Sequence, residues 1–239
     1  MQRFYTSGVF KKNDFLLEES ESYHALKVLR HKAGDVLQVV DGLGHLFQCE
    51  LIGEETKQCR LRVIETFFTK KTSPEIHIAV APTKQIERME WMTEKLTELG
   101  IAGIHFIITE RTERPRLKME RLKKTAISAM KQCQRLWLPE IEEAMPFLKF
   151  IEQAKTDRKM IAHCSSTKAG DNEGMISHIP ASFSLHTAHI LLLIGPEGDF
   201  TKQEIDLALA NSFTPVSLGQ NILRTETAAT AAAALLCIR

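Results

Sequence analysis

The sequence has no hydrophobic run long enough to cross a membrane. Its longest apolar tract, residues 228–238, is interrupted by Thr230 and is shorter than the roughly 20 residues that a membrane helix needs. The first fifteen residues also lack the apolar core of a secretion signal. We therefore expect a cytoplasmic protein with no membrane partner.

Cysteine is scarce and follows no recognised spacing. The five cysteines are odd in number, and no two have the CxxC spacing of a zinc or redox motif. This excludes a disulfide framework and predicts reduced thiols with no metal centre. His163 and Cys164 end a predicted strand, and we expect ordinary burial for them because no catalytic partner is evident in the sequence.

The chain also has no large excess of positive or of negative charge. The 31 basic and 30 acidic residues leave a net charge of +1, so a polyanion would have to be bound by a local patch. Nine basic residues and two acidic ones lie between residues 111 and 135. This run indicates either a phosphate-binding surface or a solvated helix face. The basic residues are Arg111, Arg114, Arg116, Lys118, Arg121, Lys123, Lys124, Lys131 and Arg135.

The chain does have the composition of a folded protein, with 44% hydrophobic and 26% charged residues. In residues 1–71, short apolar stretches alternate with turn signals, which predicts a small β-rich module. One helical turn is expected around residues 21–29. Residues 68–74 are polar and end in proline, as is typical of a linker.

After Pro74 the pattern changes to alternating strands and helices, which predicts a parallel sheet with helices on its faces. Residues 190–194 are continuously apolar, as expected of a central strand buried on both faces. The predicted strands are residues 76–81, 104–109, 159–164 and 189–194, and the predicted helices are residues 84–99 and 117–133.

The most apolar strand ends in the loop Gly-Pro-Glu-Gly-Asp-Phe. In open α/β sheets, ligands bind beyond the carboxyl ends of the strands, where this loop lies. Gly195 and Gly198 permit close backbone approach, and residues 201–204 have the capping-box pattern that starts a helix. Glu197 and Asp199 would repel a phosphate. The loop indicates either a ligand with hydroxyls or positive charge, or a purely structural turn.

A second loop leads through Gly219 into an alanine-rich helix that begins near Thr225. The small residues of this helix permit close packing on a neighbouring segment. Arg224 and Glu226 stand at its entrance, where charges are seldom placed for packing. They either take part in chemistry or pair with each other and shape the helix entrance.

The stretches LLLIGPEGDFTKQEI (191–205) and SLGQNILRTETAATAAAALL (217–236) resemble the signature of the RsmE family. These are bacterial enzymes of the SPOUT superfamily that methylate N3 of a uridine in 16S ribosomal RNA. The resemblance covers the whole chain. It extends to Arg3-Phe4, residues 24–30 with Gly34-Asp35, Lys84, and residues 95–100, 109–112, 132–135 and 138–139.

The resemblance implies an α/β fold class. A small N-terminal β-barrel, the PUA-like RNA-binding domain (residues 1–71), would precede a C-terminal SPOUT methyltransferase domain (residues 72–239) tied in a trefoil knot. The implied partners are 16S rRNA in the small ribosomal subunit and a second copy of the chain, since SPOUT enzymes generally form homodimers.

The resemblance also implies S-adenosylmethionine as cofactor, bound between the two loops. Backbone groups of the glycine turns can recognise an adenine edge, apolar side chains can cover its faces, and Glu197 can accept hydrogen bonds from ribose hydroxyls. The residues carried over as donor contacts are Leu193, Gly195, Glu197, Gly198, Leu218, Gly219, Ile222, Leu223 and Arg224.

Methylation of uracil N3 requires loss of its proton, which leaves negative charge on O2 and O4. Arg224 is the candidate for stabilising that charge and Glu226 for accepting the proton. The candidate RNA-binding residues are Arg3, Arg30, Lys32, Arg111, Arg114 and Arg135.

The sequence departs from the family pattern at Asp199, Lys131 and Gln220-Asn221, where the family usually has glycine, glutamate and proline-arginine. None of these changes removes a group with an assigned chemical role. Three other functions stay open: another SPOUT enzyme with a different target base, a non-catalytic RNA-binding assembly factor, and a nucleotide-phosphate enzyme. The acidic loop disfavours the last of these.

Overall fold

The computed structural model describes residues 2–8, 14–113, 117–163, 177–179 and 188–238. The chain divides into two compact units. The N-terminal unit comprises Met1–Lys71 and Ile127–Leu138, and the C-terminal unit comprises Thr72–Ala126 and Pro139–Arg239. No helix in the described part of the chain is long and apolar enough to span a bilayer.

The N-terminal unit is built on a β-sheet, which confirms the predicted β-rich module. Its strand order is β1-β3-β4-β5-β2, with β1 parallel to β3 and the other neighbours antiparallel. A short helix continues into a π-helical turn where one helical turn is predicted. The elements are β1 (Arg3–Tyr5), β2 (Asp14–Leu16), α1 (Glu19–Tyr23), the π-turn His24–Val28, β3 (Val36–Val40), β4 (His45–Glu55) and β5 (Gln58–Phe68).

A segment distant in sequence completes this unit. The backbone amide of Gly44 donates to Leu136 O over 2.9 Å, and the amide of Leu138 donates to Gly42 O over 2.9 Å. Both glycines have positive φ, and a Cβ on Gly44 would lie 2.6 Å from the Trp137 ring. Glycine is therefore required there by conformation and by space.

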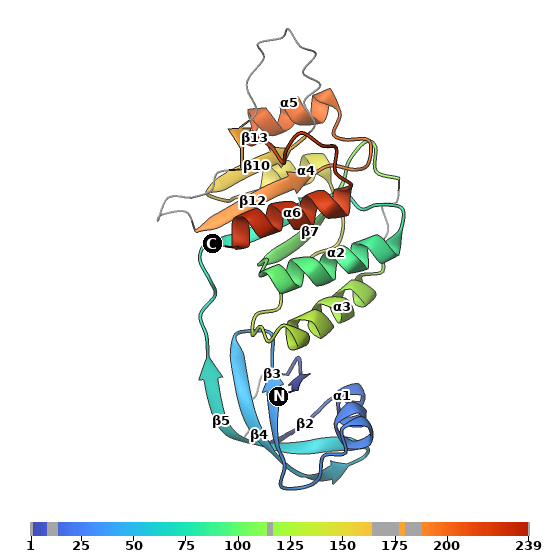
Figure 1. The fold of residues 1–239 in the computed structure, drawn as a ribbon, viewed down its shortest axis with the longest axis vertical. Coiled ribbons are helices and arrows are strands. Elements are labelled where there is room, and N and C mark those ends of the chain that lie inside the picture. Colours follow the sequence, from blue (N-terminus) through green and yellow to red (C-terminus); the bar gives the residue numbers. More distant parts are fainter. Residues whose placement is uncertain (1, 9–13, 114–116, 164–176, 180–187, 239) are drawn as a thin grey trace. The chain divides into compact units, whose positions relative to one another are not determined.

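The C-terminal unit has a parallel sheet in the order β11-β13-β10-β12-β6-β7-β8, with β9 also pairing with β7. The predicted α/β class is thereby confirmed (Figure 1). Its elements are β6 (Glu75–Val80), α2 (Ile86–Leu99), β7 (Gly103–Ile108), the first part of α3 (Met119–Gln132), β8 (Glu140–Ile141), β9 (Met145–Pro146), α4 (Phe147–Gln153), β10 (Arg158–Ala162), β11 (Ser177–His178), β12 (His189–Ile194), α5 (Lys202–Ala210), β13 (Thr214–Ser217) and α6 (Thr225–Cys237). From Ile127 onward, α3 belongs to the N-terminal unit.

Strand β12 is buried on both faces, as its continuous apolar run predicts. Ile190, Leu192 and Ile194 pack in the core that α2 and α6 cover, while Leu191 and Leu193 pack in the core that α4 and α5 cover. Helices α2 and α6 contact each other on their shared face, where the alanines of α6 allow close approach.

The predicted helix boundaries follow local chemistry. Helix α2 ends at Leu99 and is capped by Gly100, which has the left-handed φ of 104° typical of a helix C-terminus. Thr201 is the N-cap of helix α5: its hydroxyl accepts from the Glu204 amide, while the Glu204 carboxylate accepts from the Thr201 amide. This reciprocal pair is the capping box that the sequence predicts.

Candidate functional site

A pocket of about 690 Å³ lies at the carboxyl ends of the central parallel strands. It is formed by the loop after β12, the loop after β13 and the end of β10, where ligands bind in open α/β sheets. Its volume is within the range of small-molecule sites. The lining residues are Ala162, His163, Ile194, Gly195, Pro196, Glu197, Asp199, Ser217, Leu218, Gly219, Gln220, Asn221, Ile222, Leu223, Thr225 and Ala228.

The loop after β12 is a tight turn. Asp199 takes a positive φ of 60°, a conformation that aspartate tolerates better than most residues, and its amide donates to Pro196 O over 2.9 Å. A Cβ at Gly195 would lie 3.1 Å from the Phe200 ring, which packs beneath the turn. The aspartate that departs from the family pattern thus still closes the turn.

The loop after β13 also depends on a special backbone conformation. Gly219 has φ of 124°, which residues with a side chain rarely adopt. The Ile222 side chain is 85% exposed although it lines the pocket, so it offers a large apolar surface that nothing in the described chain covers. Thr225 donates its hydroxyl to Gly195 O over 3.1 Å and thereby ties the two loops together.

Arg88, in the first turn of α2, connects both acidic groups of the site. Its guanidinium donates to Glu197 over 2.9 Å, and its Nε lies 3.7 Å from Glu226 Oε1. Glu226 is 7% exposed, and its Oε2 has no hydrogen-bond partner among the described residues. Nothing in the sequence singles out Arg88, because the helical pattern around it shows only which face is apolar.

Arg224 and Glu226 do not pair with each other. Arg224 is the exposed N-terminal flanking residue of α6, and its side chain forms no ion pair within the described residues. Glu226 instead faces Arg88. The alternative in which Arg224 and Glu226 pair with each other and shape the helix entrance is therefore not observed.

The two loops predicted to bind the donor do converge on one pocket. Gly195, Glu197, Leu218, Gly219, Ile222 and Leu223 line it. Leu193, Gly198 and Arg224 do not, and the fully buried Leu193 side chain points into the core covered by α4 and α5.

His163 differs from the burial expected for it. The side chain is half-buried in the pocket wall, and its Nδ1 has no hydrogen-bond partner within the described part of the chain. Cys164, its neighbour in the predicted pair, lies outside the described residues. No signal in the sequence separated His163 from an ordinary strand residue.

The residues predicted to bind RNA are divided between the units. In the N-terminal unit Arg30 and Lys32 are exposed, whereas Arg3 is half-buried and donates to Gln134 O. Burial lowers the pKa of Arg3. Arg135 is half-buried in the same unit.

In the C-terminal unit, Arg111 donates to Gly198 O and so supports the loop after β12. Arg114 lies outside the described residues. Within the basic run, Arg121 pairs with Glu90, and Lys131 pairs with Glu21. These pairings already neutralise part of the run.

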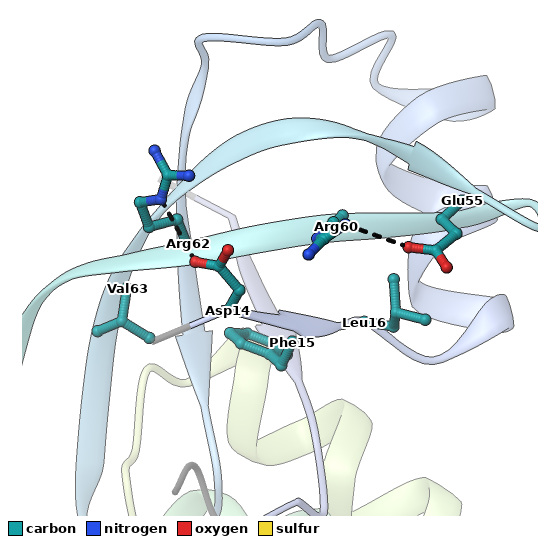
Figure 2. Close-up of a pocket in the computed structure, with 7 residues that line it drawn as sticks. All are labelled: Asp14, Phe15, Leu16, Glu55, Arg60, Arg62 and Val63. Carbon is teal, nitrogen blue, oxygen red and sulfur yellow. Dashed lines mark hydrogen bonds and ion pairs between the residues drawn. The ribbon is translucent and has the colours of Figure 1, made fainter. Parts of the chain in front are cut away.

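A second hollow, of about 590 Å³, lies in the N-terminal unit between β2, β4 and β5 (Figure 2). Arg60 and Arg62 lie along it on β5. Arg60 is 3.5 Å from Glu55, and Arg62 is 3.3 Å from Asp14. All four side chains are at least 32% exposed, so these pairs are open to exchange with a competing anion.

Comparison with known protein families shows which class of protein this chain belongs to. Residues 70–237 match the family described as RNA methyltransferase domain, and residues 17–64 match the RNA methyltransferase PUA domain. The fold, the pocket and these two matches define an RNA methyltransferase that carries a PUA domain.

Relatives over the full length give the particular family. Ribosomal RNA small subunit methyltransferase E of Rickettsia conorii is 32% identical over 97% of this chain and 93% of its own. The chain belongs to this family, RsmE. The structure of a probable rRNA-methyltransferase from Porphyromonas gingivalis is 36% identical, covers 100% of both chains and has a TM-score of 0.88. Ribosomal RNA small subunit methyltransferase E of Neisseria gonorrhoeae, solved bound to S-adenosylmethionine, is 25% identical over 99% of this chain and 96% of its own, with a TM-score of 0.82.

Proposed function

We propose that this chain transfers a methyl group from S-adenosylmethionine to N3 of a specific uridine in 16S rRNA of the small ribosomal subunit. The observation that carries the proposal is the pocket that the two family-signature loops form together, with the loops linked by the hydrogen bond from Thr225 to Gly195 O. The donor-bound relative from Neisseria gonorrhoeae has the same fold.

The pocket's chemistry fits this donor. Leu218, Ile222 and Leu223 supply apolar surface for an adenine ring, and the glycine turns leave backbone groups accessible to its edge. Glu197 supplies a carboxylate suited to ribose hydroxyls and to a cationic sulfonium, and Arg88 holds it in place. Donor contacts are assigned to the six predicted residues that line the pocket, which are Gly195, Glu197, Leu218, Gly219, Ile222 and Leu223, and not to Leu193, Gly198 or Arg224, which do not line it.

For the target base, we assign the charge-stabilising role to Arg224. As uracil N3 gives up its proton, negative charge spreads over O2 and O4, and a guanidinium within reach would stabilise it. Arg224 is exposed at the start of α6, next to the pocket residues Leu223 and Thr225, and forms no ion pair within the described chain. Its charge is thus available to a substrate.

Glu226 is assigned as the proton acceptor. Its buried Oε2 is an acceptor without a donor among the described residues, so a proton could occupy it without displacing a hydrogen bond. The other carboxylate oxygen, Oε1, lies 3.7 Å from Arg88 Nε, so the ion pair positions the side chain and leaves Oε2 uncommitted.

RNA binding is assigned to Arg3, Arg30, Lys32 and Arg135 of the N-terminal unit, and to Arg111 and Arg114 of the methyltransferase domain. We further propose that the chain is cytoplasmic and acts as a homodimer. Leu235 and Ile238 at the end of α6 are 55% and 68% exposed, which supports an apolar contact with a second copy.

The decisive test is transfer of labelled methyl from S-adenosylmethionine to small subunits from cells that lack this modification, with the labelled base identified. Label in 3-methyluridine supports the proposal. Label in another base, or in another RNA, would assign the chain to a different specificity. Loss of both transfer and donor binding would favour a non-catalytic assembly factor.

A further inference from the structure

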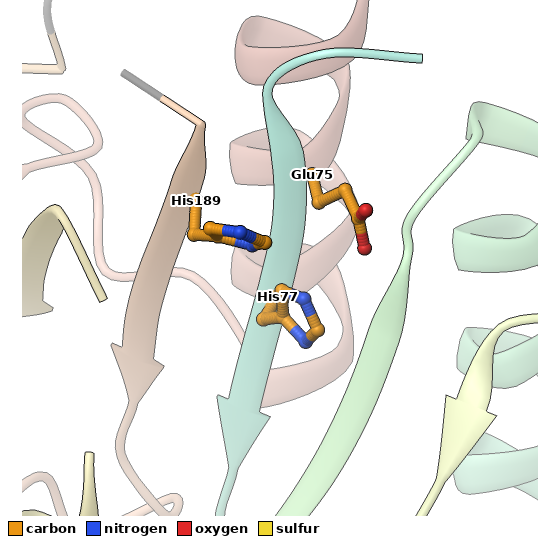
Figure 3. A group of neighbouring side chains, drawn as sticks. All are labelled: Glu75, His77 and His189. Carbon is orange, nitrogen blue, oxygen red and sulfur yellow. The ribbon is translucent and has the colours of Figure 1, made fainter. Parts of the chain in front are cut away.

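Histidine and carboxylate side chains gather at the amino ends of the central strands β6 and β12 (Figure 3). The donor pocket lies beyond the carboxyl ends of these strands. Glu75 and His77 lie on β6, and His189 begins β12. In the parallel pairing, His189 lies opposite Glu75, so all three residues project from the same face of the sheet. A ligand-binding atom from each lies within 4.8 Å of the other two.

We propose that Glu75, His77 and His189 form a binding site for a divalent transition-metal ion, with Zn²⁺ as the preferred ion. Two imidazoles and one carboxylate are a ligand set that zinc accepts, at bond lengths of about 2.0–2.2 Å. Ligand atoms around a tetrahedral ion are roughly 3.3 Å apart on that geometry. Small side-chain rotations would bring the three groups from their present separation to that spacing.

The neighbouring residues already hold His77. His105, on β7, has its Nε2 3.0 Å from His77 Nδ1, while its own Nδ1 lies 2.9 Å from Glu142 Oε2. This carboxylate–histidine–histidine chain resembles the outer hydrogen bonds that orient metal-bound histidines. We therefore assign His105 as a positioning residue.

Packing fixes the ring of His77 as well. Gly103 faces it on β7, and a Cβ there would lie 2.3 Å from His77 Nδ1. The missing side chain at this position makes room for the imidazole.

The third ligand is anchored through its backbone. The Asp157 carboxylate accepts from the amides of Ala188 and His189, each over 2.8 Å, and these bonds lower the pKa of Asp157. The start of β12 is therefore held by a group outside the ligand set, and the His189 side chain stays exposed beside it.

The position of the site assigns it a structural role. The metal would tie β12 to β6 at their amino ends, whereas the donor pocket lies beyond their carboxyl ends. Strand β12 has six residues, a length of roughly 17–20 Å at 3.3 Å per residue. The ion would then stabilise the sheet and take no part in methyl transfer.

The test is a zinc titration of the full-length protein without a polyhistidine tag, in competition with a chromophoric chelator. We expect one Zn²⁺ per chain. His189→Ala and Glu75→Gln should each weaken binding at least tenfold, and His105→Gln should weaken it less. His31→Ala is the matched control, since His31 also lies 3.0 Å from a carboxylate, that of Asp35, in the other unit. It should bind zinc as the unaltered chain does.

Two further measurements separate this site from the methyl-transfer site. Saturating Zn²⁺ should raise the melting temperature by several degrees in the unaltered chain and not in His189→Ala. The rate of methyl transfer should be the same with and without the ion. Absence of stoichiometric binding would overturn the proposal, as would equal zinc affinity in the ligand variants and His31→Ala.

Discussion

Removing Arg88 should destabilise the C-terminal unit through Glu226. The Glu226 side chain is 9% exposed, and Arg88 Nε lies 3.7 Å from its carboxylate. At that separation two unit charges attract by about 4 kcal/mol in an effective dielectric constant of about 20. Because Arg88 is 24% exposed and part of the attraction offsets desolvation, we expect Arg88→Gln to lower the free energy of unfolding by about 2 kcal/mol.

A double-mutant cycle isolates this interaction from the bond between Arg88 and Glu197. Arg88→Gln, Glu226→Gln and the double variant would be unfolded with urea and followed by circular dichroism. We expect a coupling energy of about 1–2 kcal/mol, which lies within the range of about 0.5–3 kcal/mol for residues in contact. The control cycle uses Lys84 and Glu113, which lie 3.2 Å apart but are 76% and 61% exposed and should couple by less than about 0.5 kcal/mol. If the Arg88 and Glu226 changes add to within about 0.5 kcal/mol, the assigned ion pair is refuted.

Three other predictions concern the pocket and the core. Arg224→Ala should lower the rate of methyl transfer by roughly 10²–10³-fold while the Kd for the donor stays nearly constant, and an equal loss of both would remove its catalytic assignment. Gly219→Ala should lower the free energy of unfolding by about 1–3 kcal/mol and weaken donor binding, because a φ of 124° is strained for alanine even though space is free. The control Gly53→Ala, also in open space, should change neither quantity. Burial raises the pKa of Cys49 to about 12, so its thiol should resist alkylation at pH 9 until urea unfolds the chain, as mass spectrometry of the alkylated peptide would show. The contribution of the buried, protonated thiol to stability should be lost as the pH rises from about 9 to 12.

The sequence predicted strands β6, β7, β10 and β12 and helices α2 and α3 because their apolar periodicities are strong, but it did not predict α4 or the short strands β8, β9 and β11. Strand β12 agrees with its predicted range 189–194, and helix α2 ends before Gly100 as its stop signal indicates. The two loops of the pocket were found through glycine and through the family resemblance. The trefoil knot stays a prediction.

What the sequence could not show are contacts between residues far apart in the chain. Arg88 and Glu197 are 109 positions apart, yet they form a 2.9 Å hydrogen bond. The cluster of Glu75, His77 and His189 brings together strands separated by more than a hundred residues. The spacing of cysteines, on which the expectation of no metal centre was based, does not reveal such a cluster. Periodicity shows which face of an element is buried but not which element covers it.

The return of Ile127–Leu138 to the N-terminal unit has a consequence for dissecting the molecule. A fragment cut after Lys71 would lose Trp137, whose indole donates to Thr69 O over 2.8 Å and fills the space above Gly44. Such a fragment would expose an apolar surface that the intact chain buries. The N-terminal unit is therefore not a detachable module, and transplanting it onto another protein would require the distant segment as well.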